Sequence, residues 1–243
     1  GVPMLTEFDR PSRVTRTWLF DAGNVPRKIW ERKQQDRYAD PGQPVMRPGK
    51  GVILQTGDAI YLSGQGASPQ GDRPFLDRLN LKTLATERVF QSDARSYETV
   101  ASLLSDDGKR LLTRWETQAD YPNYYLRDLA AGTKTALTQF KDPAPQLTGI
   151  QKQLVTYDRK DGVKLSATVY LPPDYKPGTR LPFVLWAYPA EFTDAATASQ
   201  VVGSPNRFTT IGGASHLFFL TQGYGVMDNP TMPIVGPGET AND

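Results

Sequence analysis

The sequence predicts a mixed fold in two parts, an all-β part followed by the opening of an α/β sheet. Three observations support this prediction. Short alternating strands separated by polar turns recur over residues 1–149. The 21 Gly and 20 Pro residues are spread along the chain in short clusters, which suits many strands joined by turns. From residue 150 a hairpin, an apolar strand, a helix and another strand follow one another, the order typical of an α/β sheet.

The all-β part contains three similar units over residues 15–30, 73–90 and 123–138. Each unit has an alternating strand, a polar turn and a second short strand, as expected of a hairpin with one buried face. The turn of the first unit falls at Ala22–Asn24. The units recur about every 50 to 60 residues, which favours blades of a β-propeller with loop insertions. A β-sandwich with irregular hairpins is the alternative.

A tight turn at Ser105–Gly108, followed by an apolar strand, is a frequent opening of a propeller blade. We expect residues 60–63 and 111–115 to be inner strands of their blades. Because propellers typically need four to eight blades, two or three blades over residues 1–149 would leave an open edge strand. The sequence therefore predicts an incomplete propeller.

The second part, residues 150–243, starts with a predicted hairpin whose strands span 151–157 and 163–171. Residues 181–188 are almost all apolar, which is typical of a strand buried on both faces. A loop is expected to run to Gly213.

A short helix is predicted over 214–222, with Leu217, Phe218 and Leu220 on its apolar side and Gly223 as its cap. A strand at 224–227 and a long loop over 228–239 follow.

The composition excludes several classes of function. With 28 Lys and Arg against 26 Asp and Glu, the formal charge of +2 gives no strong field for nucleic acid. The absence of Cys excludes disulfides, thiolate metal sites and a cysteine nucleophile. No apolar stretch approaches the roughly 20 residues of a membrane span, and Gly1–Phe8 do not form an intact signal peptide. No cofactor or metal site is predicted, because Asp106–Asp107 and Asp228–Asn229 fall at turns, where these residue types are common.

Three segments in order resemble the start of the hydrolase domain of prolyl oligopeptidase-type serine peptidases. They read VTYDRKDGVKLSATVYLPPDY from Val155, LPFVLWAYPAEF from Leu181 and GYGVMDNPTMPIVGPGE from Gly223. The AYPAEF and GPGE strings look most similar to the glutamyl endopeptidase branch of the family. The resemblance covers about residues 105–243 well and the earlier blades loosely. It implies that the β-propeller precedes, and gates, an α/β-hydrolase domain.

The resemblance also implies a serine nucleophile in a Gly-x-Ser-x-Gly elbow, followed by an Asp and a His. This chain contains no such elbow. The nearest string, Gly213–Leu217, lacks the second Gly, and its Ser215 and His216 are neighbours whose side chains would point about 100° apart on a helix. We therefore place the catalytic triad outside this chain and expect His216 to be an ordinary surface residue at the start of a helix.

Tyr188 is the candidate catalytic residue in the chain, because it matches the family's tyrosine that donates its hydroxyl to the oxyanion. From the residues alone, a tyrosine packing its ring under a loop is the alternative. Arg95, Arg110, Arg114 and Arg127 could include one that binds an acidic side chain, but a solvated strand face is the favoured interpretation of each, so none is predicted to be a site.

The expected function is part of a serine peptidase that cleaves peptides through an acyl-serine. The resemblance implies a preference for Glu before the cleaved bond. A companion fragment carrying the rest of the hydrolase domain is expected, because half a parallel sheet would expose a large apolar face. The alternatives are a non-catalytic propeller that binds a partner, or an inactive fragment. The resemblance favours a periplasmic or secreted location.

Overall fold

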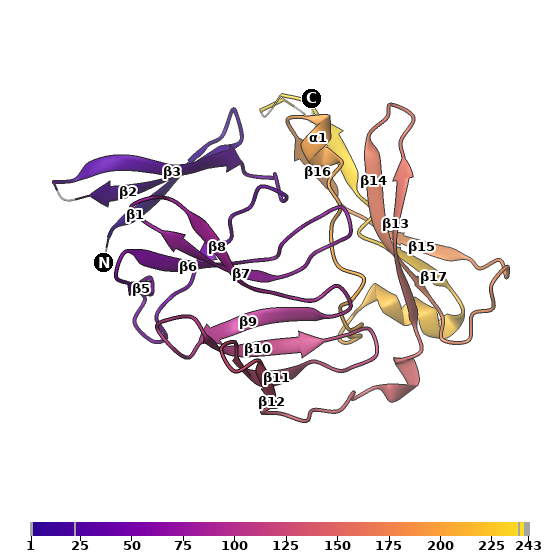
Figure 1. The fold of residues 1–243 in the computed structure, drawn as a ribbon. Helices are drawn as coiled ribbons and strands as arrows, with labels where there is room; N and C mark the ends of the chain where they lie inside the picture. Colours follow the sequence, from indigo (N-terminus) through magenta and orange to yellow (C-terminus); the bar gives the residue numbers. More distant parts are fainter. Residues whose placement is uncertain (1, 22, 238, 241–243) are drawn as a thin grey trace.

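The computed structural model describes residues 2–21, 23–237 and 239–240. Within these residues the strands form three antiparallel sheets in the first part and two sheets with parallel pairs in the second. Figure 1 shows the sheet of β13, β14, β15 and β17 on the right, beside the three earlier sheets.

Each of the first three sheets is built from strands that are close together in the sequence. The first contains β1 (Met4–Asp9), β2 (Val14–Asp21) and β3 (Val25–Lys33). The second contains β4 (Gln43–Pro44), β5 (Gln55–Thr56), β6 (Ala59–Gly64), β7 (Phe75–Asn80) and β8 (Thr86–Gln91). The third contains β9 (Tyr97–Leu103), β10 (Arg110–Glu116), β11 (Asn123–Asp128) and β12 (Thr133–Ala136). The predicted hairpins are confirmed as the pairs β2–β3, β7–β8 and β11–β12, although Ala22 of the first turn lies outside the described residues.

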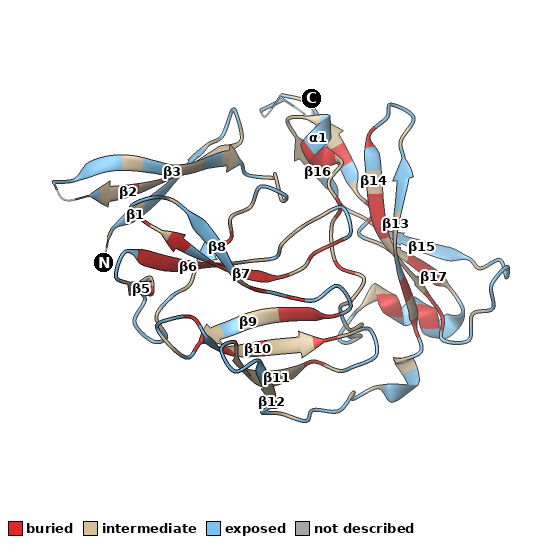
Figure 2. Cartoon of the chain, in the orientation of Figure 1, coloured by how far each residue is buried: buried red, intermediate tan, exposed pale blue. Residues whose placement is uncertain are grey.

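The second sheet is the packing centre of the first part. Successive side chains of a strand point to opposite faces, and in β6 both faces are buried. Ile60 and Leu62 join a cluster that includes Leu19 of the first sheet, whereas Tyr61 joins a cluster that includes Leu103 and Leu111 of the third. The three sheets therefore stack face to face, and Figure 2 shows the buried residues concentrated on β6 and β7.

The predicted turn at Ser105–Gly108 is confirmed. The Asp107 carboxylate accepts hydrogen bonds from the Ser105 hydroxyl at 2.6 Å and from the Lys109 backbone N–H at 3.0 Å. These bonds lower the pKa of Asp107, the Ser105 bond having the largest effect. Gly108 has a φ of +72°, and a Cβ there would lie 2.4 Å from the Tyr61 ring, so glycine is required for the turn to pack on the core.

The second part has a four-stranded sheet in the order β13–β14–β17–β15. Its strands are β13 (Gln151–Asp158), β14 (Lys164–Leu171), β15 (Phe183–Trp186) and β17 (Gly225–Asp228). The predicted hairpin is confirmed as β13–β14, and β15 pairs with β17 in parallel, as an α/β sheet requires. A smaller parallel pair joins β16 (Pro189–Phe192) to β18 (Met232–Val235). The helical segments are η1 (Pro145–Leu147), α1 (Ala195–Ala198) and η2 (His216–Gln222).

Four predictions for the second part need correction. The strand expected at 181–188 is only four residues long, and its Leu185 is 60 % exposed, because β15 is an edge strand and η2 packs only against the face that carries Val184. The helix expected at 214–222 is a 3-10 helix, and Phe218 is exposed although Leu217 and Leu220 are buried. The loops expected before Gly213 and over 228–239 contain α1, β16 and β18.

Several groups of contacts join the two parts. Gln200 accepts hydrogen bonds from the backbone N–H groups of Arg37 at 2.7 Å and Tyr38 at 3.2 Å, and donates one to the Asp36 carboxylate at 2.7 Å. The first sheet adds charged contacts to the β16 region, among them Lys33 with Asp194 at 2.6 Å. Among the described residues, no helix is long and apolar enough to cross a membrane.

Candidate functional site

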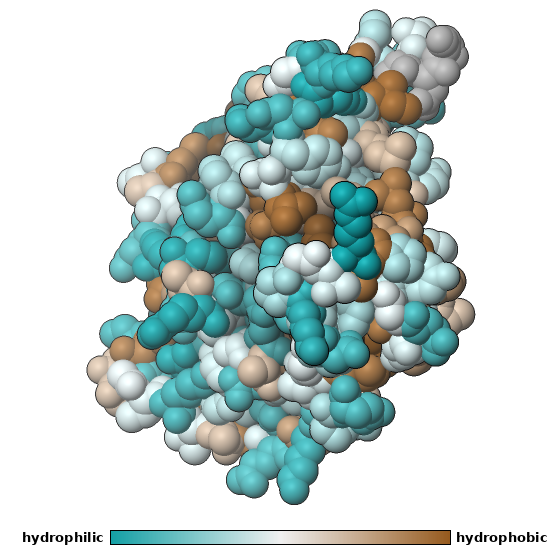
Figure 3. Space-filling view, turned by 90° about the vertical axis from the view of Figure 1, so that its right-hand side faces the viewer, coloured by the Kyte–Doolittle hydropathy of each residue, from teal (hydrophilic) through white to brown (hydrophobic). Residues whose placement is uncertain are grey.

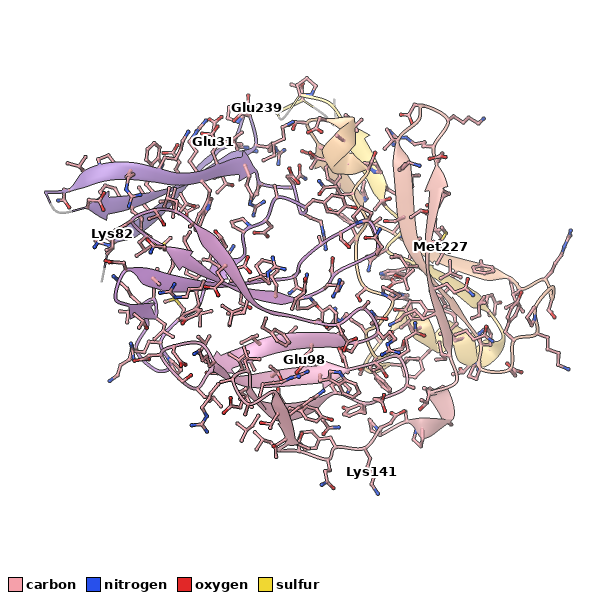
Figure 4. All side chains as sticks on the ribbon, in the orientation of Figure 1. Glu31, Lys82, Glu98, Lys141, Met227 and Glu239 are labelled. Carbon is pink, nitrogen blue, oxygen red and sulfur yellow. The ribbon has the colours of Figure 1, made fainter. Side chains whose placement is uncertain are left out.

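The candidate site lies at the carboxyl ends of the parallel strands β15 and β17. Their last residues, Trp186 and Asp228, are paired in register, and the Asn229 backbone N–H donates to the Trp186 carbonyl at 2.9 Å. Met227, labelled in Figure 4, marks this position on β17. In α/β sheets, ligands bind in the crevice outside the carboxyl ends of the strands. Tyr188 follows two residues after β15, and it is 86 % exposed.

An imidazole and a carboxylate meet at this edge. The Nε2 atom of His216 lies 2.8 Å from Oδ1 of Asp228, and the two side chains are only 19 % and 16 % exposed. The His216 ring also stacks on Trp186, with centroids 4.7 Å apart and planes 7° apart. His216 does begin a helix, but the prediction of an ordinary surface residue is wrong, because this packing buries most of its ring.

Ser215 has a structural contact of its own. Its hydroxyl oxygen accepts a hydrogen bond from the Leu217 backbone N–H at 3.2 Å, so that it caps the first turn of η2. Gly223 ends η2 with a φ of +79°, as predicted for a helix cap. The His216–Asp228 pair joins an imidazole to a carboxylate, as a hydrolase triad does, but through Nε2, the nitrogen that a triad directs at its serine. Ser215 is directed at the helix backbone.

Behind this edge lies a polar cavity of about 280 Å³ between β10 and the sheet of the second part. Its lining includes Arg114 and Glu116 of β10, Lys152 of β13, Arg207 and Asp228. Arg114 is thus the only one of the four predicted arginine candidates to line this cavity. The cavity is a meeting point of the two parts of the chain.

The charged groups of the cavity are unevenly paired. Glu116 is 2 % exposed, and it lies 3.4 Å from Arg114 and 3.7 Å from Arg207. Burial raises the pKa of Glu116, and the two arginines oppose this shift. Lys152 is 8 % exposed, and its ammonium donates to the Arg207 carbonyl. Burial lowers the pKa of Lys152 to about 8.

Tyr170 lies between the cavity and the core of the second part. Its neighbours include Val226, which is fully buried in the cluster around η2. Burial is the main cause that raises the pKa of Tyr170 to about 12, and the negative charge of Asp228 adds to it. The phenol is therefore neutral at physiological pH.

The other arginine candidates have separate roles. Arg127 binds the buried Glu98 carboxylate through two nitrogens, and Arg95 and Arg110 are exposed.

Over the described residues, no group of three His, Asp or Glu side chains could hold a metal ion. A larger cavity of about 650 Å³ lies between the first two sheets. It shares no lining residue with the polar cavity.

No protein-family model matches the chain. It is 41 % identical over 255 residues to the probable chloroplastic glutamyl endopeptidase of Oryza sativa subsp. japonica, and 39 % identical over 256 residues to that of Arabidopsis thaliana. Each alignment covers 96 % of this chain and 27 % of the relative. The chain therefore spans about a quarter of the length of the curated relatives it matches.

Solved structures of peptidases share the fold at low sequence identity. An acylaminoacyl peptidase matches 99 % of this chain and 32 % of its own, with a TM-score of 0.52 and 14 % identity. Porphyromonas gingivalis dipeptidyl peptidase 4 matches 93 % of this chain and 36 % of its own, with a TM-score of 0.51 and 10 % identity. The resemblance seen in the sequence is thus confirmed: over 96 % of its length this chain is similar to probable glutamyl endopeptidases, and it shares its fold with solved peptidases.

Proposed function

We propose that the chain is a segment of a serine peptidase that hydrolyses peptide bonds through an acyl-serine intermediate. The observation that carries this proposal is the similarity to glutamyl endopeptidases over 96 % of the chain. In this proposal residues 1–149 are two to three blades of a β-propeller, and residues 150–243 are the first part of an α/β-hydrolase domain. The face-to-face stacking of the first three sheets and the parallel β15–β17 pair support this division.

The proposed role of Tyr188 is to donate its hydroxyl to the oxyanion that forms when the serine attacks the peptide carbonyl. Its position just beyond the carboxyl end of β15, and its 86 % exposure, leave the hydroxyl available to a bound peptide. Such a donor accelerates the reaction because it stabilises a charge that exists only in the transition state. The serine, aspartate and histidine of the triad would come from residues outside this chain. The preference for Glu before the cleaved bond rests on the name of the relatives.

The apolar edge of the second part supports the presence of further hydrolase-domain residues. Phe183, Leu185 and Trp186 of β15 are each more than half exposed, and Figure 3 shows hydrophobic residues gathered on this side of the molecule. An exposed apolar edge strand is costly, so a covering element is favoured. The proposed cover is the rest of the hydrolase domain, either in a longer chain or in a companion fragment. Intact mass spectrometry of the purified protein tests this proposal. A single species of 26.9 kDa, the mass of this chain alone, would contradict it.

The test of the activity is labelling with a fluorescent fluorophosphonate in the longer protein that contains this segment. Labelling of a serine outside residues 1–243 is expected, together with cleavage of peptide substrates. Tyr188→Phe should lower kcat by about 10²–10³-fold, the effect of losing one oxyanion donor, while labelling of the folded protein shows that it is intact. Unlabelled protein that still binds peptides would favour the non-catalytic propeller instead.

A further inference from the structure

Lys152 is a buried cation with no carboxylate at ion-pair distance among the described residues, although the charge of Glu116 acts on it from farther away. Its side chain is mostly buried on β13, and its ammonium donates to one backbone carbonyl, that of Arg207. Among the described residues, no carboxylate lies within 4.0 Å of this ammonium. An ammonium in such a place loses most of its hydration, and one neutral acceptor replaces little of it. The polar cavity thus holds a positive charge whose remaining hydrogens have no acceptor among the described residues.

The charges around Lys152 leave the cavity with excess positive charge. Three cations line it, and all three interact with the single charge of Glu116. Arg114 and Arg207 lie 3.4 and 3.7 Å from it, which is long for strong ion pairs, and Lys152 lies farther away. The second carboxylate, that of Asp228, is held by His216. Arg207 keeps a 58 % exposed side chain, whose guanidinium lies 5.1 Å from the centre of the Tyr97 ring. Arg207 can therefore reach a ligand without disrupting the core.

The size and place of the cavity suit one acidic side chain. Its volume of about 280 Å³ is just below the range of roughly 300–1,000 Å³ typical of small-molecule pockets, so it fits a single side chain better than a larger ligand. Asp228 and Asn229 line it, which places it directly beside the carboxyl ends of β15 and β17. Glu116 would repel a doubly charged anion more than a single carboxylate.

We infer that Lys152 and Arg207 form a subsite that binds the carboxylate of an acidic residue in a peptide. This inference rests on the proposed function, which it deepens by assigning the recognition of acidic substrates to two residues. Lys152 supplies a buried positive charge, and Arg207 supplies a guanidinium that is more exposed. Recognition by the charged pair requires a carboxylate, so the matching amide should be rejected.

The test is isothermal titration calorimetry of the longer protein that contains this segment with N-acetylglutamate α-amide and N-acetylglutamine α-amide. These probes have the same shape and differ only in the side-chain charge. The unsubstituted chain should bind the glutamate probe at least tenfold more tightly. Lys152→Met and Arg207→Gln should each abolish that preference, whereas Lys82→Met, at a 75 % exposed lysine of the second sheet, should keep it.

Equal affinity for the two probes, or a preference that survives both substitutions, would overturn the subsite. Circular dichroism melting of each variant shows whether it is folded, which matters for Arg207→Gln as well because Arg207 lies 3.7 Å from the buried Glu116. The readout is binding, so it is independent of the fluorophosphonate test. Glutamate-selective binding without a labelled serine would leave the subsite standing and refute the peptidase. A labelled serine without glutamate-selective binding would support the peptidase and refute the subsite.

Discussion

The imidazole of His216, at the first position of η2, lies 2.8 Å from the carboxylate of Asp228, the last residue of β17. This contact ties the helical segment to the end of the parallel strands. The stacking of His216 on Trp186 extends the link to β15. One side chain therefore fixes the relative positions of three elements at the candidate site.

Asp228→Asn should lower the free energy of unfolding by about 1–3 kcal/mol, because it weakens a hydrogen bond between two mostly buried groups. The matched control is Asp158→Asn, in a pair with Lys164 whose side chains are about 70 % exposed, and it should change stability by less than about 1 kcal/mol. Urea unfolding followed by circular dichroism measures both. Equal effects of the two substitutions would mean that the His216 contact adds nothing.

Arg127→Met should be among the most damaging substitutions in the third sheet. Glu98 lies on β9 and is labelled in Figure 4. It is 1 % exposed, and its carboxylate accepts hydrogen bonds from Arg127 and from the Thr113 hydroxyl, the latter at 2.6 Å. Removal of the guanidinium would leave a buried carboxylate without its main counter-charge, at a cost of about 3–5 kcal/mol. Thermal and urea unfolding check this value, with Lys164→Met as the exposed control. A loss below about 1 kcal/mol would show that Lys134, 4.0 Å away, can replace the arginine.

Lys152 should make the protein more stable at alkaline pH. Its pKa is about 8 in the folded protein and 10.5 without the effects of folding. Below pH 8 both states carry the charge, and the folded state bears the full cost of burying it. Between pH 8 and 10.5 the unfolded state binds more protons, so this cost is relieved as the pH rises.

Lys152→Met should therefore raise the free energy of unfolding at pH 7, by up to about 3 kcal/mol, and the gain should shrink by pH 10. Urea unfolding of both proteins across this pH range provides the measurement. A gain that stays constant with pH would show that Lys152 titrates normally.

Gly108→Ala should destabilise the protein more than Gly132→Ala. Both glycines have positive φ angles, +72° and +67°, so alanine is strained at either position by about 1–2 kcal/mol. Nothing lies within 4 Å of a Cβ at Gly132, whereas a Cβ at Gly108 would press on the buried Tyr61 ring. The clash should add about 1–3 kcal/mol at Gly108 alone. Similar melting temperatures of the two variants would contradict this account of the turn.

The sequence predicts the local elements well because their signals are local. The hairpin β13–β14 lies within a residue of its expected bounds, since alternation and a Gly162 turn are both visible in a short window. The parallel pair β16–β18 could not be predicted, because it joins Pro189 to Met232, about 40 residues apart, and neither strand alternates clearly. The prediction that β15 is buried on both faces is wrong. An apolar run shows that a strand is suited to burial, but it does not show whether the described residues include the elements that would bury it.

The site was less predictable than the fold. The contact between His216 and Asp228 depends on η2 folding back along β17, which no spacing rule for sequence neighbours describes. Lys152 carries no signal of its own either, since an inward-facing lysine on an alternating strand looks the same in sequence as a solvated one. Among the cations of the cavity, Arg114 was the one that the sequence singled out, as a strand arginine that could bind an acidic side chain.

The parallel pairs of the second part impose an order on synthesis. The three antiparallel sheets pair strands that are near neighbours in sequence, so each can close as soon as its last strand leaves the ribosome. β15 and β16 must instead wait about 40 residues for β17 and β18, which takes about 2–8 s at translation rates of 5–20 residues per second. During that interval their backbone groups are open to pairing with another nascent chain. The first three sheets can therefore fold before the strands of the candidate site pair beside them.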